Sequence, residues 1–322
     1  MKRLLLIAAA GLLALCAPSA AQDAAWPARA VTVVVPFAAG GTTDMFARIF
    51  TSDMQTKYGK PFVVENKAGA GGTIGATAAA KAEKDGYTLL VGTASTHGIA
   101  PFVYKALSYN VETDFQPISL FAKVPNILVV ANKLPVKTIQ EVIDYAKANP
   151  GKLNFGSSGI GSSQQLAAEL FQSMAGVKLN HVPYKASNEV MAAIIGGEID
   201  LAFDNVTLAL PQAKAGTVRA IGLTGPNRSE AAPEIPTIAE TLPGFDAQSW
   251  HGLFAPAGTP KPVIDLLAAE VKRIIVQPAV DAKLKEIGAV PAPMTPDEFA
   301  AFGASERGKY KEIVAKAGIT PQ

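Results

Sequence analysis

The sequence is poor in cysteine and in concentrated charge. Its 322 residues include one cysteine, Cys16, so a disulfide-stapled scaffold is excluded and the fold must depend on an apolar core. Only 17% of the residues are charged and no block of like charge occurs, which argues against a nucleic-acid or anionic-membrane partner, because both need a concentrated positive field. The apolar share of 49% excludes a disordered chain.

The N-terminus has the order of parts of a secretory signal peptide. Lys2 and Arg3 precede an uncharged stretch over 4–17, and small residues follow up to Ala21. This stretch is shorter than the ~20 residues of a membrane-spanning helix, and the large Leu15 before Cys16 argues against lipidation. We predict a signal peptide over 1–21, export to the periplasm, and no membrane insertion after cleavage.

Removal of this segment leaves 27 basic and 27 acidic residues, so the mature chain has no net charge. We expect it to be a monomer.

Apolar, β-branched runs alternate with helical patterns along the mature chain. The run over 31–35 is followed by a glycine turn over 36–41 and by a helical pattern from Thr42 to Gly59. Such alternation predicts an α/β fold with a parallel, helix-covered sheet, divided into two lobes. Further strands are predicted at 62–64, 87–91, 127–130, 153–155, 181–184, 199–203, 218–223 and 250–254, and further helices at 74–84, 138–149, 164–174, 188–195, after 262, and from a capping box at 295–298 to about 317.

Two strand-to-helix turns combine glycines with hydroxyl side chains and contain no Lys or Arg. Helix N-termini carry unpaired N–H donors and a partial positive charge, so these turns predict binding of a carboxylate or phosphate between the lobes. The alternative is two ordinary turns, with Thr43 and Ser162 or Ser163 as N-caps. The candidate ligand-binding residues are Phe37, Ala38, Gly40, Gly41, Thr42, Thr43 and Asp44 in the first turn, and Ser157, Ser158, Gly159, Gly161, Ser162 and Ser163, with Gln165, in the second.

Four more candidates follow predicted strands elsewhere in the chain. Ser95 and His97 come after the strand at 87–91, and His97 is either structural or part of a cleft wall. Tyr184 ends the strand at 181–184. Asp204, with Asn205 beside it, follows the strand at 199–203, where a turn-forming pair is the alternative.

Signatures of nucleotide, metal and hydrolase chemistry are missing. Ile74 stands where Gly69-x-Gly71 would need its third glycine, and no phosphate-binding Gly-Lys-Ser/Thr string occurs. Ile160 breaks the Gly-x-Ser-x-Gly spacing around Ser158. The histidines show no metal-ligand spacing. We therefore predict no cofactor, no metal and no enzymatic activity.

The ordered motifs of the mature chain resemble the periplasmic solute receptors of tripartite tricarboxylate transporters, the Bug or TctC family. The resemblance covers nearly all of the mature chain. Three positions depart from the common pattern: Gln165 stands where many members have His, Ala186 where Gly is common, and Ala39 where Pro is frequent. The matching strings lie at 35–44 with Arg48 following, and at 64–72, 85–90, 156–159, 182–185, 236–240 and 250–260.

This resemblance implies a two-lobed, type II-like Venus-flytrap architecture, with 22–124 and 247–322 as lobe 1 and 125–246 as lobe 2. The lobes would close on a small organic carboxylate, held by backbone amides, hydroxyls and waters of the loops at 37–44 and 157–163. The implied partners are the membrane components of a tripartite tricarboxylate transporter. Two alternatives are a co-receptor for a sensor system and a periplasmic enzyme with His97 or Asp204 as acid or base.

Overall fold

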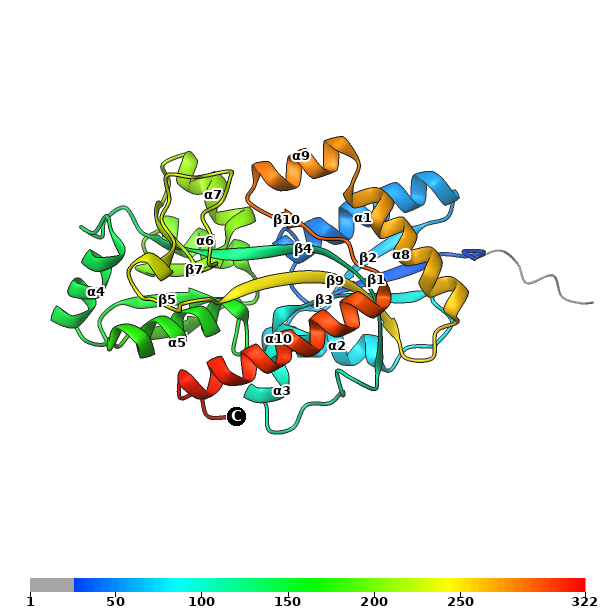
Figure 1. The fold of residues 1–322 in the computed structure, drawn as a ribbon, viewed down its shortest axis with the longest axis horizontal. Helices are drawn as coiled ribbons and strands as arrows, with labels where there is room; N and C mark the ends of the chain where they lie inside the picture. The colour runs from blue at the N-terminus through cyan, green and yellow to red at the C-terminus, as the bar shows by residue number, and fades with distance from the viewer. Residues whose placement is uncertain (1–25, 322) are drawn as a thin grey trace, which may run out of the picture.

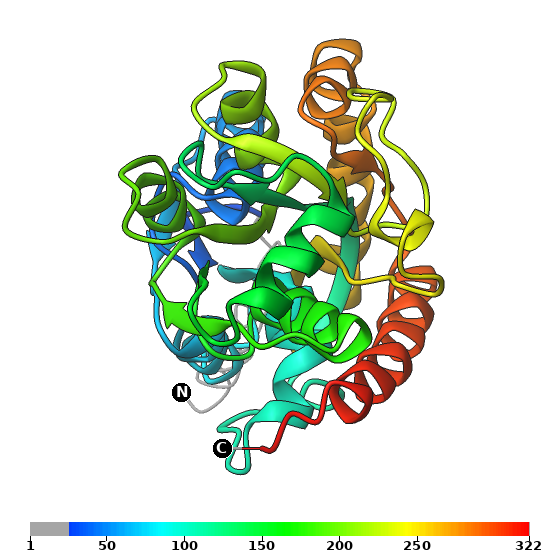
Figure 2. The same cartoon turned by 90° about the vertical axis from the view of Figure 1, so that its left-hand side faces the viewer.

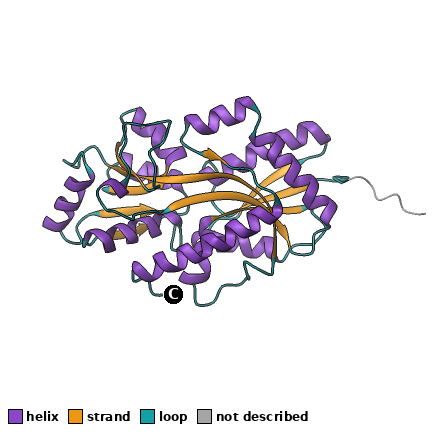
Figure 3. Cartoon of the chain, in the orientation of Figure 1, coloured by secondary structure: helices purple, strands orange, loops and turns teal. Residues whose placement is uncertain are grey.

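A single mixed β-sheet with helices around it forms the body of the protein (Figures 1 and 3). The computed structural model describes residues 26–321. The predicted signal peptide and Cys16 lie outside the described residues. No helix between residues 26 and 321 combines the length and the apolar character needed to cross a membrane.

The sheet has the strand order β2-β1-β3-β9-β4-β7-β5-β6, and β10 and β8 pair with β4 beside this path. The strands are β1 (Val31–Val35), β2 (Phe62–Asn66), β3 (Thr88–Thr93), β4 (Phe115–Val130), β5 (Asn154–Ser157), β6 (Asn180–Pro183), β7 (Leu201–Asn205), β8 (Arg219–Leu223), β9 (Gln248–Pro256) and β10 (Val290–Pro291). The helices are α1 (Thr42–Tyr58), α2 (Thr73–Ala80), α3 (Ala100–Val103), α4 (Ile139–Ala148), α5 (Ser163–Ala175), α6 (Ser187–Ile195), α7 (Val206–Lys214), α8 (Lys261–Ile275), α9 (Pro278–Glu286) and α10 (Pro296–Lys316), with short helical turns at Ala70–Gly72, Ala94–Ile99 and Ile238–Glu240.

Strand β4 joins two parts of the sheet. Its residues 115–125 pair with β9, and its residues 126–130 pair with β7 and β8. We call β1–β3, β9, β10 and the first part of β4 segment A, and β5–β8 with the rest of β4 segment B; the loops and helices that follow a strand belong to its segment. Figure 1 shows β4 and β9 running side by side from segment A towards segment B.

The expectation of a parallel sheet is correct for only part of it. Strands β1, β2 and β3 are parallel, as are β5, β6 and β7, but β4, β9 and β10 pair antiparallel. The strand predicted at 127–130 is the end of the much longer β4. Pro117, Lys123 and Pro125 interrupt its apolar pattern in the sequence, and the ladder shows register shifts between Pro117 and Ser119.

The central strands are buried because helices cover both faces of the sheet, as the end-on view in Figure 2 shows, while the edge strands β2 and β6 are partly exposed. In β1 only Thr32 is partly exposed, and every residue of β7 is buried. Helix α10 begins at the predicted capping box, where Thr295 and Glu298 each bond the other's backbone N–H. It contacts β4 and then α5, so it packs against both segments. Helices α3, α7 and α9 were not predicted.

Candidate anion-binding site

Segments A and B meet at one small cavity. Its volume is about 20 Å³, which is room for about one water molecule. Gly41 of segment A and Ser158 of segment B both line it. The full lining is Phe37, Gly41, Thr42, Thr43, Thr93, Ser95, Ser158, Ser163, Gln164, Ala186, Ser187, Asn205, Ser249 and His251.

Four helices begin at this cavity. Gly41, Ala186 and Asn205 are the N-cap residues of α1, α6 and α7, and Ser163 is the first residue of α5. No side chain caps the first three helices, so their leading N–H groups have no side-chain acceptor. Each helix N-terminus carries roughly half a positive charge. Because the lining contains no Lys or Arg, the positive field in the cavity comes from the main chain.

Asp44 fixes the loop in front of α1. Its carboxylate accepts the N–H of Gly40 at 3.0 Å, Nδ2 of Asn66 at 3.0 Å and Nε of Arg48 at 2.7 Å. Burial acts to raise the pKa of Asp44, but these hydrogen bonds outweigh it and lower that pKa. Asp44 is therefore an ionised group that positions the loop, and it is not one of the lining residues.

The loop in front of α5 is also held by its own side chains. Ser157 Oγ lies 2.6 Å from Nε2 of His181 and accepts the N–H of Gly159 at 3.2 Å. Gln165 Oε1 accepts the N–H of Gly161 at 2.8 Å. Ser162 caps α5 by accepting the N–H of Gln165, as the alternative interpretation predicted, whereas the N-cap of α1 is Gly41 and not Thr43.

Three hydrogen bonds join the two segments around the cavity. The hydroxyls of Thr42 and Thr207 lie 2.7 Å apart. Ser163 N donates to Ser95 Oγ at 3.1 Å, and the Tyr104 hydroxyl donates to the carbonyl oxygen of Ile160 at 2.7 Å. These bonds hold the loops of segment A against those of segment B around the cavity.

Several hydroxyls of the lining are open to a bound molecule. Thr43, Ser158 and Ser163 line the cavity, and their hydroxyls have no hydrogen-bond partner among residues 26–321. Two of them stand in the first turns of α1 and α5. Hydroxyls next to helix N-termini are suitable donors for a carboxylate oxygen.

A buried amide links the cavity wall to a buried acid. Gln164 Oε1 accepts the N–H of Ser158, and its Nε2 donates to Ser187 Oγ at 2.6 Å and to Asp204 Oδ1. Asp204 is completely buried and also accepts the N–H of Asn205 at 2.7 Å. Burial raises its pKa to about 7 against the opposing effect of these hydrogen bonds.

The structure brings seven of the candidate residues to the cavity and places most of the others beside it. His97 lies elsewhere, buried in an aromatic cluster and stacked on Phe254 with ring centroids 4.0 Å apart. Burial lowers the pKa of His97 to about 3, and the ring is neutral. The candidates in the lining are Phe37, Gly41, Thr42, Thr43, Ser95, Ser158 and Ser163. The others lie in loops, at strand ends or in first helical turns: Ala38, Gly40, Asp44, Ser157, Gly159, Gly161, Ser162, Gln165, Tyr184 and Asp204.

Sequence reasoning missed Thr93, Gln164, Ala186, Ser187, Ser249 and His251 as lining residues. Ser187 carries a usable signal, since it opens a helix after a strand in the same way as Ser163. Ser249 and His251 carry none, because they come from β9, which reaches the cavity from a distant part of the chain. Burial lowers the pKa of His251 to about 3.

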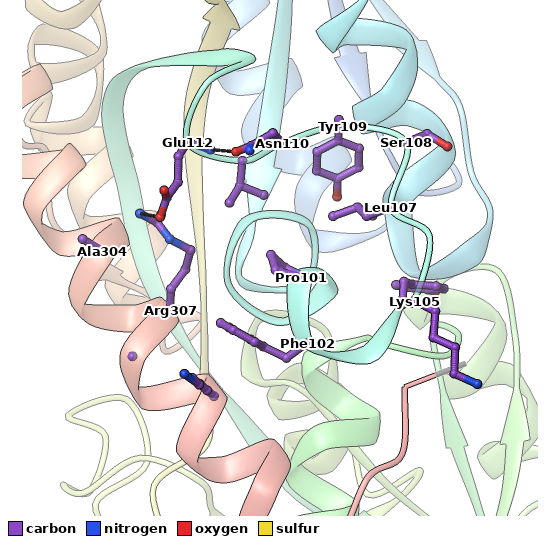
Figure 4. Close-up of a pocket in the computed structure, with 14 residues that line it drawn as sticks. Pro101, Phe102, Lys105, Leu107, Ser108, Tyr109, Asn110, Glu112, Ala304 and Arg307 are labelled. Carbon is purple, nitrogen blue, oxygen red and sulfur yellow. Dashed lines mark hydrogen bonds and ion pairs between the residues drawn. The ribbon is translucent and has the colours of Figure 1, made fainter.

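A larger hollow of about 880 Å³ lies between residues 101–112 and α10 (Figure 4). Its Arg307 points towards Glu112, and the two form an ion pair at 3.1 Å. This hollow is open and contains none of the candidate residues. Nowhere in 26–321 do three His, Cys, Asp or Glu side chains come close enough together to hold a metal ion. The cavity between the segments is therefore the candidate site.

The mixed α/β fold is that of periplasmic binding proteins. Residues 46–319 match the family described as "Tripartite tricarboxylate transporter family receptor", TctC. The protein BugT of Bordetella pertussis is 35% identical over 314 residues, which are 97% of this chain and 95% of BugT. This chain belongs to the TctC receptor family, as its motifs indicated.

Solved structures of related proteins have the same fold. Rpa4515 of R. palustris, solved with adipate, is 37% identical with a TM-score of 0.90, covering 92% of this chain and 100% of its own. The periplasmic binding protein BugD is 36% identical with a TM-score of 0.88, covering 92% and 100%. MatC of Rhodopseudomonas palustris, solved with malate, is 35% identical with a TM-score of 0.85, covering 89% and 99%.

Proposed function

We propose that this chain is a periplasmic receptor that binds a small organic carboxylate between segments A and B, at the loops that line the cavity. The cavity has room for about one water, so it must widen to admit the acid. The observation that carries the proposal is the meeting of four helix N-termini at a cavity whose lining has no cationic side chain. Adipate in Rpa4515 and malate in MatC make dicarboxylates the first ligands to test.

Ligand capture would use the two-lobed arrangement that the sequence predicts, with 22–124 and 247–322 as lobe 1 and 125–246 as lobe 2. The change of β4 from β9 to β7 and β8 between residues 125 and 126 supports this division. A carboxylate that binds one loop gains further donors when the other loop closes over it, so binding favours closure. The closed form would be the one recognised by the membrane components of a tripartite tricarboxylate transporter.

We further propose that the ligand is bound and released without chemical change. The two residues considered as acid or base are poorly placed for catalysis. His97 stacks inside an aromatic cluster, and Asp204 is completely buried and accepts a hydrogen bond from Gln164 behind the cavity wall. The signal peptide predicted over 1–21 would deliver the chain to the periplasm.

Calorimetric titration and thermal-shift measurements against a panel of acids test this function. The panel contains adipate, malate, tricarboxylates, aromatic acids and amino acids, and adipamide serves as the uncharged control. A few charge-assisted hydrogen bonds of about 1.5–3 kcal/mol each, less the ordering cost, predict a Kd near 1 μM, about −8 kcal/mol. Failure of every acid to bind more tightly than adipamide would contradict the proposal.

Thr43→Val tests the site itself. Val has nearly the same shape as Thr but lacks the hydroxyl, and Thr43 is buried in the lining. Loss of a hydrogen bond to a charged group costs about 1.5–3 kcal/mol, so the Kd for the best acid should rise roughly 10- to 150-fold. Thr56→Val, at the exposed far end of the same helix, is the matched control and should bind like wild type. Equal affinity of the two variants would remove Thr43 from the site.

A further inference from the structure

Asp204 is a buried acid that has no cationic partner among residues 26–321, and it lies directly behind the cavity. Resting on the function proposed above, we propose that Asp204 sets the charge selectivity of the site by taking up a proton from solvent when a dicarboxylate binds. The step forms one O–H bond on the Asp204 carboxylate and consumes one solvent proton. The bond that breaks is the bond to hydrogen in the proton donor, which is hydronium or the acid form of the buffer.

The contacts of Asp204 leave one oxygen for that proton. Oδ1 accepts from Gln164 Nε2 and from the N–H of Asn205. Oδ2 is buried and has no hydrogen-bond partner among the described residues. A buried carboxylate oxygen without a donor is costly, and a proton placed on it removes that cost.

No charged group near Asp204 offers an alternative way to neutralise it. Helices α5, α6 and α7 and strands β4 and β5 pack against β7. Their titratable side chains are Lys123 in β4, Glu169 in α5, Glu189 in α6 and Lys214 at the far end of α7, while β5 has none. None of these hydrogen-bonds Asp204 or contributes to the shift of its pKa. Across the cavity, the one titratable side chain of the lining is His251, which is neutral because burial lowers its pKa to about 3.

Three residues carry the coupling from the cavity to Asp204. Gln164, Ser187 and Asn205 all line the cavity and all contact Asp204 or donate to it. An anion in the cavity therefore faces the Asp204 carboxyl through one layer of polar groups. Two negative charges at this separation inside a protein repel each other, so the bound anion favours the protonated acid.

The sign and size of the effect follow from linkage. Burial raises the pKa of free Asp204 to about 7, and the anion raises it further. Asp204 should then take up close to no proton on binding near pH 5.5, up to about half a proton near pH 7, and a larger fraction as the pH rises towards the pKa of the ligand-bound form. Above about pH 7 the Kd for a dicarboxylate should rise by up to roughly tenfold per pH unit. Above that pH, the negative charge of ionised Asp204 would disfavour dicarboxylates and favour ligands that carry an ammonium group.

The test titrates adipate into the full mature protein by calorimetry, in pairs of buffers with different ionisation enthalpies, from about pH 6 to about pH 8.5. The expected result for wild type is proton uptake that rises with pH. Asp204→Asn keeps the shape of the side chain and cannot ionise, so it should bind adipate with no proton uptake and a Kd independent of pH. Asp200→Asn is the matched control, because Asp200 lies just before the other end of β7 and pairs with Lys133. It should take up protons as wild type does.

Infrared spectroscopy of the wild-type protein gives a second readout that needs no variant. The carbonyl band of a protonated carboxylic acid should titrate near pH 7 in the free protein and should persist to higher pH with adipate. Zero proton uptake while adipate binds, or equal uptake by Asp204→Asn and wild type, would overturn the proposal. So would a free protein with no protonated carboxyl above about pH 5, a result that counts against Asp204 even if no acid binds. Absence of binding by every acid would instead count against the proposed function.

Discussion

Substitution of Gly71 by alanine should both destabilise the fold and weaken ligand binding. Gly71 lies in the turn before α2 with φ +60°, and a Cβ atom on it would come within 2.2 Å of the Ile160 carbonyl oxygen. Gly71 belongs to segment A and Ile160 precedes α5 in segment B. Because ordinary contact begins near 3.4 Å, the two loops must separate by about 1 Å in Gly71→Ala.

The expected loss of free energy in Gly71→Ala has two parts. The positive φ costs alanine roughly 1–2 kcal/mol whether the loops meet or not, and this part lowers the free energy of unfolding. Separation of the loops breaks the bond from Tyr104 to Ile160 and loosens that from Ser163 to Ser95, at about 0.5–1.5 kcal/mol each. If closure accompanies binding, this second part of about 1–3 kcal/mol appears as a Kd for adipate raised roughly 5- to 150-fold.

Gly59→Ala separates the two parts. Gly59 ends α1 with φ +64°, and an added Cβ would meet no atom within 4 Å. It should lower the thermal midpoint as Gly71→Ala does and leave the affinity unchanged. The assays are thermal unfolding by circular dichroism and calorimetric titration with adipate. If both variants bind adipate as tightly as wild type, the close approach of Gly71 to Ile160 has no part in binding.

Two further substitutions test the supports around the site. Asp44→Asn should lower the free energy of unfolding by about 1–3 kcal/mol by weakening the bonds to Gly40, Arg48 and Asn66. The pKa of Asp44 is lowered in the fold, so the contribution of its carboxylate to the free energy of unfolding is present above the unfolded pKa and disappears as the pH falls through the folded pKa. Urea unfolding at pH 7 and pH 3 should therefore show a smaller pH dependence of stability for Asp44→Asn than for wild type. An equal pH dependence would contradict this. Glu270→Gln should lower the thermal midpoint, because buried Glu270 binds Lys57 and Tyr58 of α1 together with Arg273, and it should leave adipate affinity unchanged since this cluster lies outside the lining. Spectrophotometric titration should also show a fall in the pKa of Tyr58, which burial and Glu270 raise to about 12, and an unchanged value would remove Glu270 from that effect.

Local patterns were sufficient to predict the elements that begin at the site. The run over 31–35, the glycine turn and the helix to residue 58 are found as predicted, and so is the second turn before α5. These features depend on apolar periodicity and on helix-start chemistry, both of which lie within a few residues of sequence.

The crossing strands could not be predicted in the same way. Strand β4 has prolines inside it, and its burial comes from β9, whose partner residues lie more than 120 positions further along the chain. Ser249 and His251 therefore reach the cavity through pairing that no local pattern specifies. The same limit applies to His97, whose position after a strand suggested the cleft but whose ring turns into the aromatic cluster with Phe254.

On the function proposed above, main-chain donors would let the site both capture and release an anion. A helix N-terminus contributes about 0.3–1 kcal/mol to a nearby negative charge, and up to about 2 kcal/mol when partly buried. Four of them therefore give moderate attraction at fixed positions, without the entropy lost when a Lys or Arg side chain is immobilised. The donors belong to both segments, since Gly41 precedes α1 and Ser163 opens α5. Full attraction thus requires the segments to meet, and their separation is enough to weaken it and free the ligand.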